Sequence, residues 1–384
     1  MTMVRTSGYL SPHMRRLAAS VALTLLGLGV GAMMVVGYFG NHHYSDFRIF
    51  WQAGRDVLQH HSPYPSPTAT RLHAQDQFVY PAPAAVLMAA FALLPLGTSA
   101  FLFLVLSIVS AAASLHILGV RDVRCYAITF GSLPLIQGLV MGTVTPLLML
   151  TLALTWRYRN RVWPIACTAA VAIGLKLFLA PLGIWLVGTR RWRALLASVG
   201  ASAVLLIGCW SIVGASTLAQ YPKLLSELTK VEGSYGYSTY AFALRLGLAP
   251  SAAHTVVLSA VGVLAVCVVA IARRPHGDPA AFALAVVACL VASPIVWLHY
   301  FALLVIPVAV LAPRLSWLWV LPLAGWLFPN LNHPAATWKI VGGHMVLALL
   351  TAIALRSTLA AASGQPAGHH EMVTGAAAPT EPAG

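Results

Sequence analysis

Long apolar runs fill most of this chain and constrain its fold more than any other feature. Hydrophobic residues make up 59% of the 384 positions and charged residues only 8%, whereas a soluble domain has about 25% charged residues. A surface this poor in charge cannot face water throughout. Several windows contain the roughly 20 apolar residues that a membrane-spanning helix needs. The sequence therefore predicts an all-α polytopic membrane protein.

Basic residues lie mostly in short clusters beside the apolar runs, and they predict the orientation of the chain. A net charge of +14 could suggest a nucleic-acid partner. Basic residues beside helix ends, however, follow the positive-inside rule and need no nucleic acid. The clusters expected on the cytoplasmic side are Arg15 and Arg16; Arg157, Arg159 and Arg161; Arg190, Arg191 and Arg193; Arg273 and Arg274; Arg314; and Arg356. We therefore expect both termini to be cytoplasmic.

The apolar runs between these clusters predict a bundle of roughly 10–12 transmembrane or re-entrant helices within residues 17–356. Residues 17–39 form too long an apolar run for a signal peptide, so we interpret them as a retained first helix. A cytoplasmic segment, residues 1–16, precedes it. Residues 357–384 are rich in Ala, Pro and Gly and are expected to be a disordered cytoplasmic tail.

Two parts of this arrangement need separate treatment. Residues 162–188 lie between two basic clusters, and each leg is too short to cross a bilayer. This predicts a re-entrant or V-shaped pair with Lys176 at its tip. Residues 82–119 allow two interpretations: two crossings would put Arg121 and Arg124 outside, against the charge rule, while one crossing leaves a long apolar run.

The acidic residues gather on the predicted outer face. Two long polar intervals, residues 40–81 and residues 214–250, are expected to be outer loops. They contain five of the nine acidic residues, namely Asp46, Asp56, Asp76, Glu227 and Glu232. No carboxylate falls in the middle of an apolar run, which argues against the intramembrane proton relay of a pump. Any acid–base chemistry should therefore occur at the outer face.

Residues 46–59 of the first outer loop show the periodicity of an amphipathic helix lying in the membrane interface. Ser45 is a suitable N-cap and places Asp46 in the first turn, where the helix dipole favours an ionised carboxylate. Asp46 is therefore a candidate catalytic residue, although a purely structural role at the helix start stays open. The expected apolar face comprises Phe47, Phe50, Trp51, Gly54, Val57 and Leu58.

The sequence favours neither a metal site nor a disulfide framework. The five cysteines lie in apolar runs at irregular spacing, as small core residues do. His42, His43 and Asp46 are close enough in sequence to share an ion. Adjacent histidines point in different directions, however, and one carboxylate is little for a divalent cation. We expect no cofactor.

Three stretches resemble the motifs of glycosyltransferase family 87. The first runs from SDFRIFWQAGRDVLQHHSPY to FVYPAPAAVLMAAFALLPLG, and the second is GLKLFLAPLGIWLVGTRRWRA. The third, SPIVWLHYFALLVIP, resembles the family's Ser-Pro-x-x-Trp-x-His motif. The match runs in order over roughly residues 44–310. The chain departs from many members at MGTVTP, where Thr143 replaces a glutamine.

The resemblance implies the GT-C fold and the transfer of a sugar from a polyprenyl-phosphate donor, with mannose as the first expectation, to a glycolipid or glycan. Asp46 would be the general base of an inverting reaction that needs no second acid, because the leaving group is already a phosphate. His299 matches the position of the family's active-site histidine and, with Lys176 and Arg48, is a candidate ligand of the donor phosphate. A snorkelling role for Lys176, a structural role for His299 and a surface-helix or acceptor-binding role for Arg48 stay open. The enzyme would lie in the bacterial plasma membrane and serve the cell envelope from its periplasmic or exterior face.

Aromatic residues are candidates for the sugar contacts. Tyr80 and Trp297 are expected to stack on sugar rings, although aromatic residues at a membrane interface commonly serve only as anchors. Tyr237, within the Gly/Tyr/Ser-rich residues 233–245, would suit sugar hydroxyls, and a plain connecting loop fits that stretch equally well. Two other functions stay open at this stage: a transporter or flippase of lipids or sugar-lipids, and a non-catalytic membrane subunit.

Overall fold

The protein is helical wherever its structure is described. The computed structural model describes residues 44–65, 72, 77–329 and 335–362, together with residues 14, 22, 29 and 33, and no side chain after residue 358. The elements are α2 (Ser45–Leu58), α4 (Ala82–Ala92), α5 (Leu96–Ile117), α6 (Val123–Phe130), α7 (Leu133–Met141), α8 (Thr145–Arg157), α9 (Val162–Leu175), η1 (Leu177–Leu179), α10 (Leu182–Gly188), α11 (Trp192–Val213), α12 (Ala215–Glu232), α13 (Thr239–Arg245), α14 (Pro250–Ala272), α15 (Asp278–Ala292), η2 (Leu298–Leu304), α16 (Val305–Leu311), η3 (Trp317–Leu327) and α17 (Thr337–Ala362).

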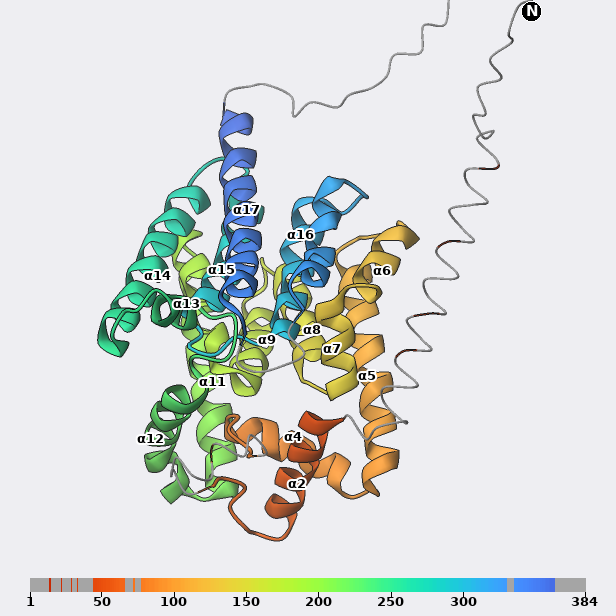
Figure 1. The fold of residues 1–384 in the computed structure, drawn as a ribbon, viewed down its shortest axis with the longest axis vertical. Coiled ribbons are helices and arrows are strands. Elements are labelled where there is room, and N and C mark those ends of the chain that lie inside the picture. The colour runs from red at the N-terminus through yellow and green to blue at the C-terminus, as the bar shows by residue number, and fades with distance from the viewer. Residues whose placement is uncertain are drawn as a thin grey trace, which may run out of the picture.

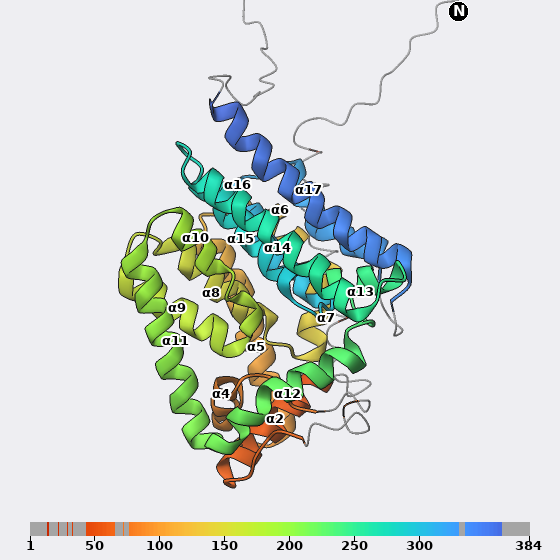
Figure 2. The ribbon, with the colours of Figure 1, turned by 90° about the vertical axis from the view of Figure 1, so that its left-hand side faces the viewer.

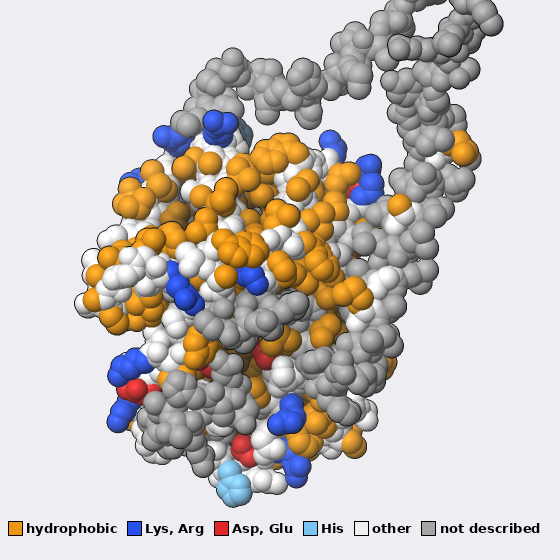
Figure 3. All heavy atoms as spheres, in the orientation of Figure 1, with side chains coloured by type: hydrophobic (Ala, Val, Ile, Leu, Met, Phe, Trp, Pro, Cys, Tyr) orange, Lys and Arg blue, Asp and Glu red, His pale blue; other side chains and the backbone are white. Residues whose placement is uncertain are grey.

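Four of these helices are long and apolar enough to cross a membrane: α5, α11, α14 and the part of α17 from Thr337 to Thr358. A fifth span is possible if α6 and α7, which meet at 60°, cross together. Large apolar side chains point outward from the long helices, and a broad area of hydrophobic side chains lies across the face in Figure 3. The prediction of an all-α polytopic membrane protein is confirmed.

The helices separate the molecule into two ends. Helices α2, α4 and α12 lie together at the lower end of Figure 1, while α16 and the C-terminal end of α17 lie at the upper end. Figure 2 shows the same separation from the side. We call the end with α2, α4 and α12 the α2 end, and the end with α16 and the C-terminal end of α17 the basic end. Helix α5 runs from the α2 end to the basic end, where α6 begins.

The lengths of α4 and α5 favour one crossing over residues 82–119. Pro95 interrupts the apolar run, so that α4 has only 11 residues and packs on α2, while α5 has 22 residues. A helix of 11 residues is about 16 Å long, roughly half of the hydrocarbon thickness. Of these two helices only α5 is long and apolar enough to cross a membrane, and α6, which begins at Val123, lies toward the end of the molecule opposite α2.

The predicted hairpin over residues 162–188 is present. Helix α9 ends at Leu175, Lys176 is extended with φ −154° and ψ 113°, and η1 and α10 follow. The two feet of the hairpin meet at Asp278, whose carboxylate lies 3.6 Å from Arg159 Nε and 2.7 Å from an Arg191 guanidinium nitrogen. Lys176 is therefore at the far tip of a helical pair that begins and ends at the basic end.

Several local predictions were wrong. Residues 214–250 are not a simple loop, because α12 and α13 occupy most of them, and only residues 233–238 connect the two helices. Tyr44 rather than Ser45 takes the N-cap position of α2. Leu58 is 43% exposed, although it was expected on the apolar face of this helix. Helix α17 continues to residue 362, into the predicted tail.

Some predictions fall where nothing is described. The expected first helix over residues 17–39, apart from three isolated residues, lies outside the described part of the chain, as does the tail after residue 362. His42, His43 and Asp76 also lie outside it.

Candidate active site

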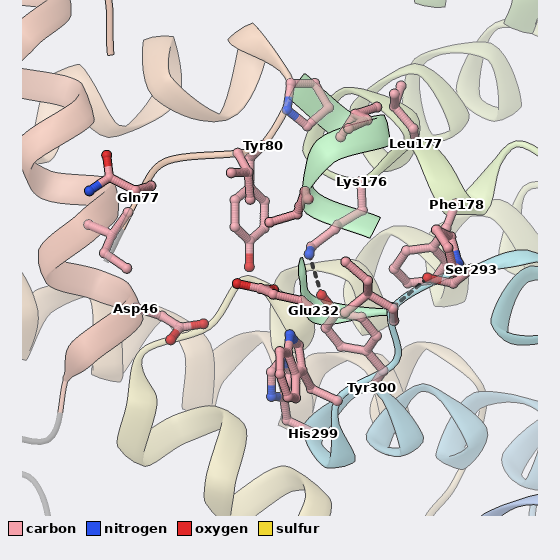
Figure 4. A pocket seen from close by; sticks show the side chains of 18 of the residues that line it. Asp46, Gln77, Tyr80, Lys176, Leu177, Phe178, Glu232, Ser293, His299 and Tyr300 are labelled. Atoms are coloured by element: carbon pink, nitrogen blue, oxygen red, sulfur yellow. Dashed lines mark hydrogen bonds between the residues drawn. The ribbon is translucent and has the colours of Figure 1, made fainter. Parts of the chain in front are cut away.

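A cavity of about 470 Å³ opens between the α2 end and the tip of the hairpin. Residues from six separate segments line it: the start of α2, the turn before α4, the second half of α7, the hairpin tip, α12 from Tyr221 onward and residues 293–300. Among the side chains that line it are Asp46, Tyr80, Lys176, Trp297 and His299. Figure 4 shows four of these, all but Trp297, labelled around one space. The structure thus brings together five residues that the sequence singled out separately.

Asp46 is placed at the cavity by the close packing of α2 on α4. Phe47 and Phe50 are fully buried, and a Cβ at Gly54 would lie 2.5 Å from the Met88 backbone, so only glycine permits this approach. Burial raises the pKa of Asp46 from 3.8 to about 6, against the opposing charge of Lys176 and a 3.5 Å contact with the Ser45 hydroxyl. The carboxylate is mostly ionised at neutral pH, and its affinity for a proton is raised.

Lys176 is held by two aromatic rings. Its Nζ lies 3.8 Å from the centroid of the Tyr80 ring and 4.7 Å from that of Tyr300, and it donates a hydrogen bond to the Tyr300 hydroxyl. These contacts orient the ammonium group. In the described part of the chain no carboxylate oxygen lies within 4 Å of Nζ. Burial lowers the pKa of Lys176 to about 7, and the nearby Asp46 and Glu232 carboxylates raise it, so an anion in the cavity would favour its charged form.

His299 presents an imidazole without protein partners. The side chain is 1% exposed, and neither ring nitrogen has a hydrogen-bond partner among the described residues. Its ring packs edge-on against Tyr300, with centroids 4.5 Å apart. A buried polar group that makes no hydrogen bond is costly, by about 1–3 kcal/mol. Such a group beside a cavity is suited to bind a polar ligand there.

Sequence reasoning missed two residues of this site. Glu232, the last residue of α12, lines the cavity with 9% exposure, and burial raises the pKa of its carboxyl group from 4.5 to about 7. Tyr300 positions Lys176, as described above. The sequence placed Glu232 in an outer loop. The one sequence feature that distinguished it there was its position next to the turn at residues 233–238. Tyr300 follows His299 directly, and that adjacency could have drawn attention to it.

The turn after Glu232 docks on the segment that leads to His299. The Tyr237 backbone N–H donates to the Val296 carbonyl at 2.7 Å, and a Cβ at Gly236 would lie 2.3 Å from that oxygen. The Tyr221 hydroxyl of α12 donates to the Val79 carbonyl at 3.0 Å, beside Tyr80. Hydrogen bonds to two backbone carbonyls thus hold α12 and the turn after it against both walls of the cavity.

Two predicted site residues are not in the cavity. Arg48 is exposed on α2, and the cavity lining does not include it. Tyr237 is 1% exposed, donates its hydroxyl to the Phe328 carbonyl at 2.7 Å and packs on Phe301 and Phe328. Its contacts are those of a packing residue. Among the described residues no three His, Cys, Asp or Glu side chains gather into a metal site.

The arrangement combines a partly buried base with cationic and hydrogen-bonding groups in one space. A carboxylate with a raised pKa is a suitable proton acceptor for a hydroxyl group. An ammonium group without a carboxylate partner and an imidazole with free nitrogens are suited to hold a phosphate. The apolar residues Leu177, Phe178 and Ile295 also line the cavity and can accommodate hydrocarbon.

Comparison with known proteins supports this interpretation. A curated relative from Mycolicibacterium smegmatis, named polyprenol-phosphate-mannose-dependent alpha-(1-2)-phosphatidylinositol pentamannoside mannosyltransferase, is 27% identical over 292 residues. The match covers 71% of this chain and 66% of the relative, just under two thirds of its length. No solved structure matches the chain. The model of glycosyltransferase family 87 matches residues 78–296, more than half of the sequence, and the chain belongs to that family.

Proposed function

We propose that the protein is an inverting mannosyltransferase that uses a polyprenyl-phosphate mannose donor and a glycolipid or glycan acceptor. The observation that carries the proposal is the single cavity lined by Asp46, Lys176 and His299. Family membership and the donor and acceptor classes in the relative's name support it.

In the proposed reaction Asp46 takes the proton of an acceptor hydroxyl. The oxygen attacks the anomeric carbon of mannose from the face opposite the phosphate, and the bond between that carbon and the phosphate oxygen breaks. The electron pair of this bond leaves with the phosphate, whose charge changes from −1 to −2 while Asp46 becomes neutral. Lys176 and His299 would bind the phosphate and stabilise its growing charge.

The cavity lies toward the α2 end, and we propose that this end faces the periplasm or the exterior. The clusters that contain Arg159 and Arg191 meet at the opposite end of the hairpin, at Asp278. The positive-inside rule assigns that end to the cytoplasm. The lipid-linked sugar would then be used on the outer face of the membrane.

The second carboxyl group in the cavity raises a competing function. Glycoside hydrolases also use two neighbouring carboxyl groups, one of which protonates the leaving oxygen. Asp46 and Glu232 would fit that description by residue type. A phosphate leaving group needs no such protonation, and family membership favours transfer. Release of free mannose in the absence of an acceptor would support the hydrolase.

The test is incubation of the purified full-length protein with polyprenyl-phosphate mannose and candidate phosphatidylinositol mannosides, analysed by mass spectrometry. We expect the acceptor to gain one hexose and polyprenyl phosphate to appear in equal amount. The Asp46→Asn variant should lose about a thousandfold in rate, because the amide cannot take the proton. Movement of the donor across vesicles without covalent change would instead indicate a transporter.

Asp56→Asn is the matched control for Asp46→Asn. Asp56 lies on the same helix, its carboxylate accepts a hydrogen bond from Gln52 at 2.9 Å, and it does not line the cavity. Its replacement should leave the rate unchanged. Equal rates in wild type and Asp46→Asn would refute the assignment of the base.

A further inference from the structure

Among the described residues, Glu232 is the one acid lining the cavity that the proposed reaction does not use. Its carboxyl group is buried to 9% exposure and lines the cavity, yet it makes no hydrogen bond or ion pair with any residue of the described chain. Leaving such a group without a partner is costly. The packing of α12 holds it there, so a ligand of the cavity is the expected partner.

The place of Glu232 in the cavity fits the geometry of the proposed reaction. In an inverting displacement the leaving phosphate, the sugar and the attacking hydroxyl lie in that order, because the nucleophile enters opposite the leaving group. Lys176 marks the phosphate and Asp46 marks the attacking hydroxyl. Figure 4 shows the Glu232 side chain in the space between Asp46 and Lys176. A group in that space adjoins the sugar that is being transferred.

We propose that Glu232 is a specificity-determining residue, whose carboxyl group binds one or more hydroxyl groups of the transferred sugar. This inference rests on the proposed function, because it takes the phosphate and the acceptor to lie at Lys176 and Asp46. Carboxyl groups suit this task, since two oxygens can meet neighbouring hydroxyls of one ring. The ligand class is a pyranose with free ring hydroxyls, linked to a lipid phosphate.

Charge considerations support sugar binding over phosphate binding. An ionised carboxylate repels the phosphate that Lys176 would hold, so Glu232 is poorly placed to serve as a phosphate ligand. Burial raises the pKa of this carboxyl group to about 7, so both its neutral and its ionised form are present at neutral pH. In either form it can bond a sugar hydroxyl, because a hydroxyl both donates and accepts.

The experiment is a cycle between Glu232 variants and modified donors. Transfer is measured for wild type, Glu232→Gln and Glu232→Ala with polyprenyl-phosphate mannose and with donors carrying 2-, 3-, 4- or 6-deoxymannose. We expect Glu232→Ala to lose about tenfold to a hundredfold in kcat/KM with mannose. One deoxy donor should cost wild type a similar factor and cost Glu232→Ala almost nothing more, whereas the others cost both proteins equally.

Glu227→Gln is the matched control. Glu227 lies one and a half turns earlier on α12, where its carboxylate pairs with Lys230 at 2.8 Å outside the cavity. Its replacement should change neither kcat/KM nor the preference among donors. If Glu232→Ala fails to fold, as judged by thermal unfolding in detergent, Glu232→Gln is used in its place. Glutamine keeps the shape and the hydrogen bonds of a neutral carboxyl group and should lose less than alanine.

Binding measurements separate the failure of this inference from that of the proposed function. The affinities for polyprenyl-phosphate mannose and for sugar-free polyprenyl phosphate are compared in wild type and Glu232→Ala. We expect only the mannose-bearing lipid to bind more weakly to the variant. A loss of the same size for both lipids, or losses that are additive for every deoxy donor, would overturn the role of Glu232. Wild-type protein that binds neither lipid would refute the donor assignment itself.

Discussion

The two ends of the molecule treat their carboxylates in opposite ways. At the basic end, Asp278 accepts hydrogen bonds from the Trp185 indole at 2.7 Å and from Arg191 at 3.0 and 2.7 Å. Around the cavity, Asp46 has one 3.5 Å contact with Ser45, and the Glu232 carboxyl group has no partner in the described chain. The paired acid joins the feet of a hairpin, whereas the unpaired acids face a space large enough for a ligand.

The difference indicates what each acid contributes. Hydrogen bonds to a charged group stabilise the folded state, by roughly 1.5–3 kcal/mol each when buried. Asp278 is partly exposed and gains part of that stabilisation from its protein partners. Asp46 and Glu232 lose hydration on burial and gain little from the protein, which is why their pKa values rise to about 6 and about 7. Groups with raised pKa values near neutrality in a cavity are typical of binding and catalysis.

After the Asp46 variant already described, removing the charge at the hairpin tip should have the largest effect on kcat/KM. We expect Lys176→Met to lower kcat/KM by about a hundredfold or more, because the phosphate would lose its cation while the hairpin keeps its length. The affinity for sugar-free polyprenyl phosphate should fall in parallel. Transfer is measured with polyprenyl-phosphate mannose, and binding with the sugar-free lipid.

Lys223→Met is the control for this variant. Lys223 is exposed on α12 and does not line the cavity, so its loss should leave both measurements unchanged. Unchanged affinity of Lys176→Met for the phosphate lipid would limit Lys176 to packing between Tyr80 and Tyr300.

The second effect concerns pH. Burial raises the pKa of Asp46 to about 6, so the base is ionised above that pH and neutral below it. We expect kcat/KM to fall about tenfold per pH unit below pH 6, because only the ionised form accepts the acceptor's proton. In Glu232→Gln the fall of kcat/KM at acidic pH should occur at the same pH, even if the maximal kcat/KM is lower. Loss of this acidic fall in Glu232→Gln would transfer the role of base to Glu232.

These acids also show how much of the candidate site could be predicted from the sequence. The spacing around Asp46 predicted the interfacial helix, and the lysine in an apolar run between basic clusters predicted the hairpin tip. Both are local patterns. Glu232 reaches the cavity through contacts between distant parts of the chain, such as the hydrogen bond from Tyr221 of α12 to Val79, 142 positions earlier. No periodicity within α12 contains that information, because it arises from tertiary contacts.

The prediction of Arg48 as a phosphate ligand had a weakness that helical geometry could have revealed. Residues two positions apart on an α-helix are about 200° apart around its axis. If Asp46 faces a cavity, Arg48 points away from it, and the structure shows Arg48 exposed. The same geometry places Ile49 and Phe50, three and four residues after Asp46, on the cavity side, and both line the cavity.

A third and smaller effect tests the basic end. Asp278→Asn should reduce the free energy of unfolding by about 1–3 kcal/mol, because Arg191 loses its ionic partner. This expected loss of unfolding free energy is at the lower end of the values for breaking a buried ion pair, because Asp278 is 27% and Arg191 20% exposed to solvent. The kcat/KM of folded protein should stay within about twofold of wild type. Thermal unfolding in detergent and the transfer assay measure the two quantities.

Asp122→Asn is the control for Asp278→Asn. Asp122 pairs with Arg124 at 2.7 Å at the same end, but Arg124 is 54% exposed, so the pair is screened by solvent. Its loss should change stability less than that of Asp278. An Asp278→Asn variant with normal stability and a large loss of kcat/KM would contradict the assignment of this acid to structure.

The smallest effect is expected from Arg48→Ala, and it tests the boundary of the cavity. Arg48 is exposed on the side of α2 away from Asp46, so its loss should change kcat/KM by less than about twofold. Arg48 and Lys176 are then a matched pair of cations, one outside the cavity and one inside. A loss as large as that of Lys176→Met would mean that Arg48 contacts the donor, as one interpretation of the sequence predicted. The transfer assay with saturating acceptor and varied donor measures the ratio of the two effects directly.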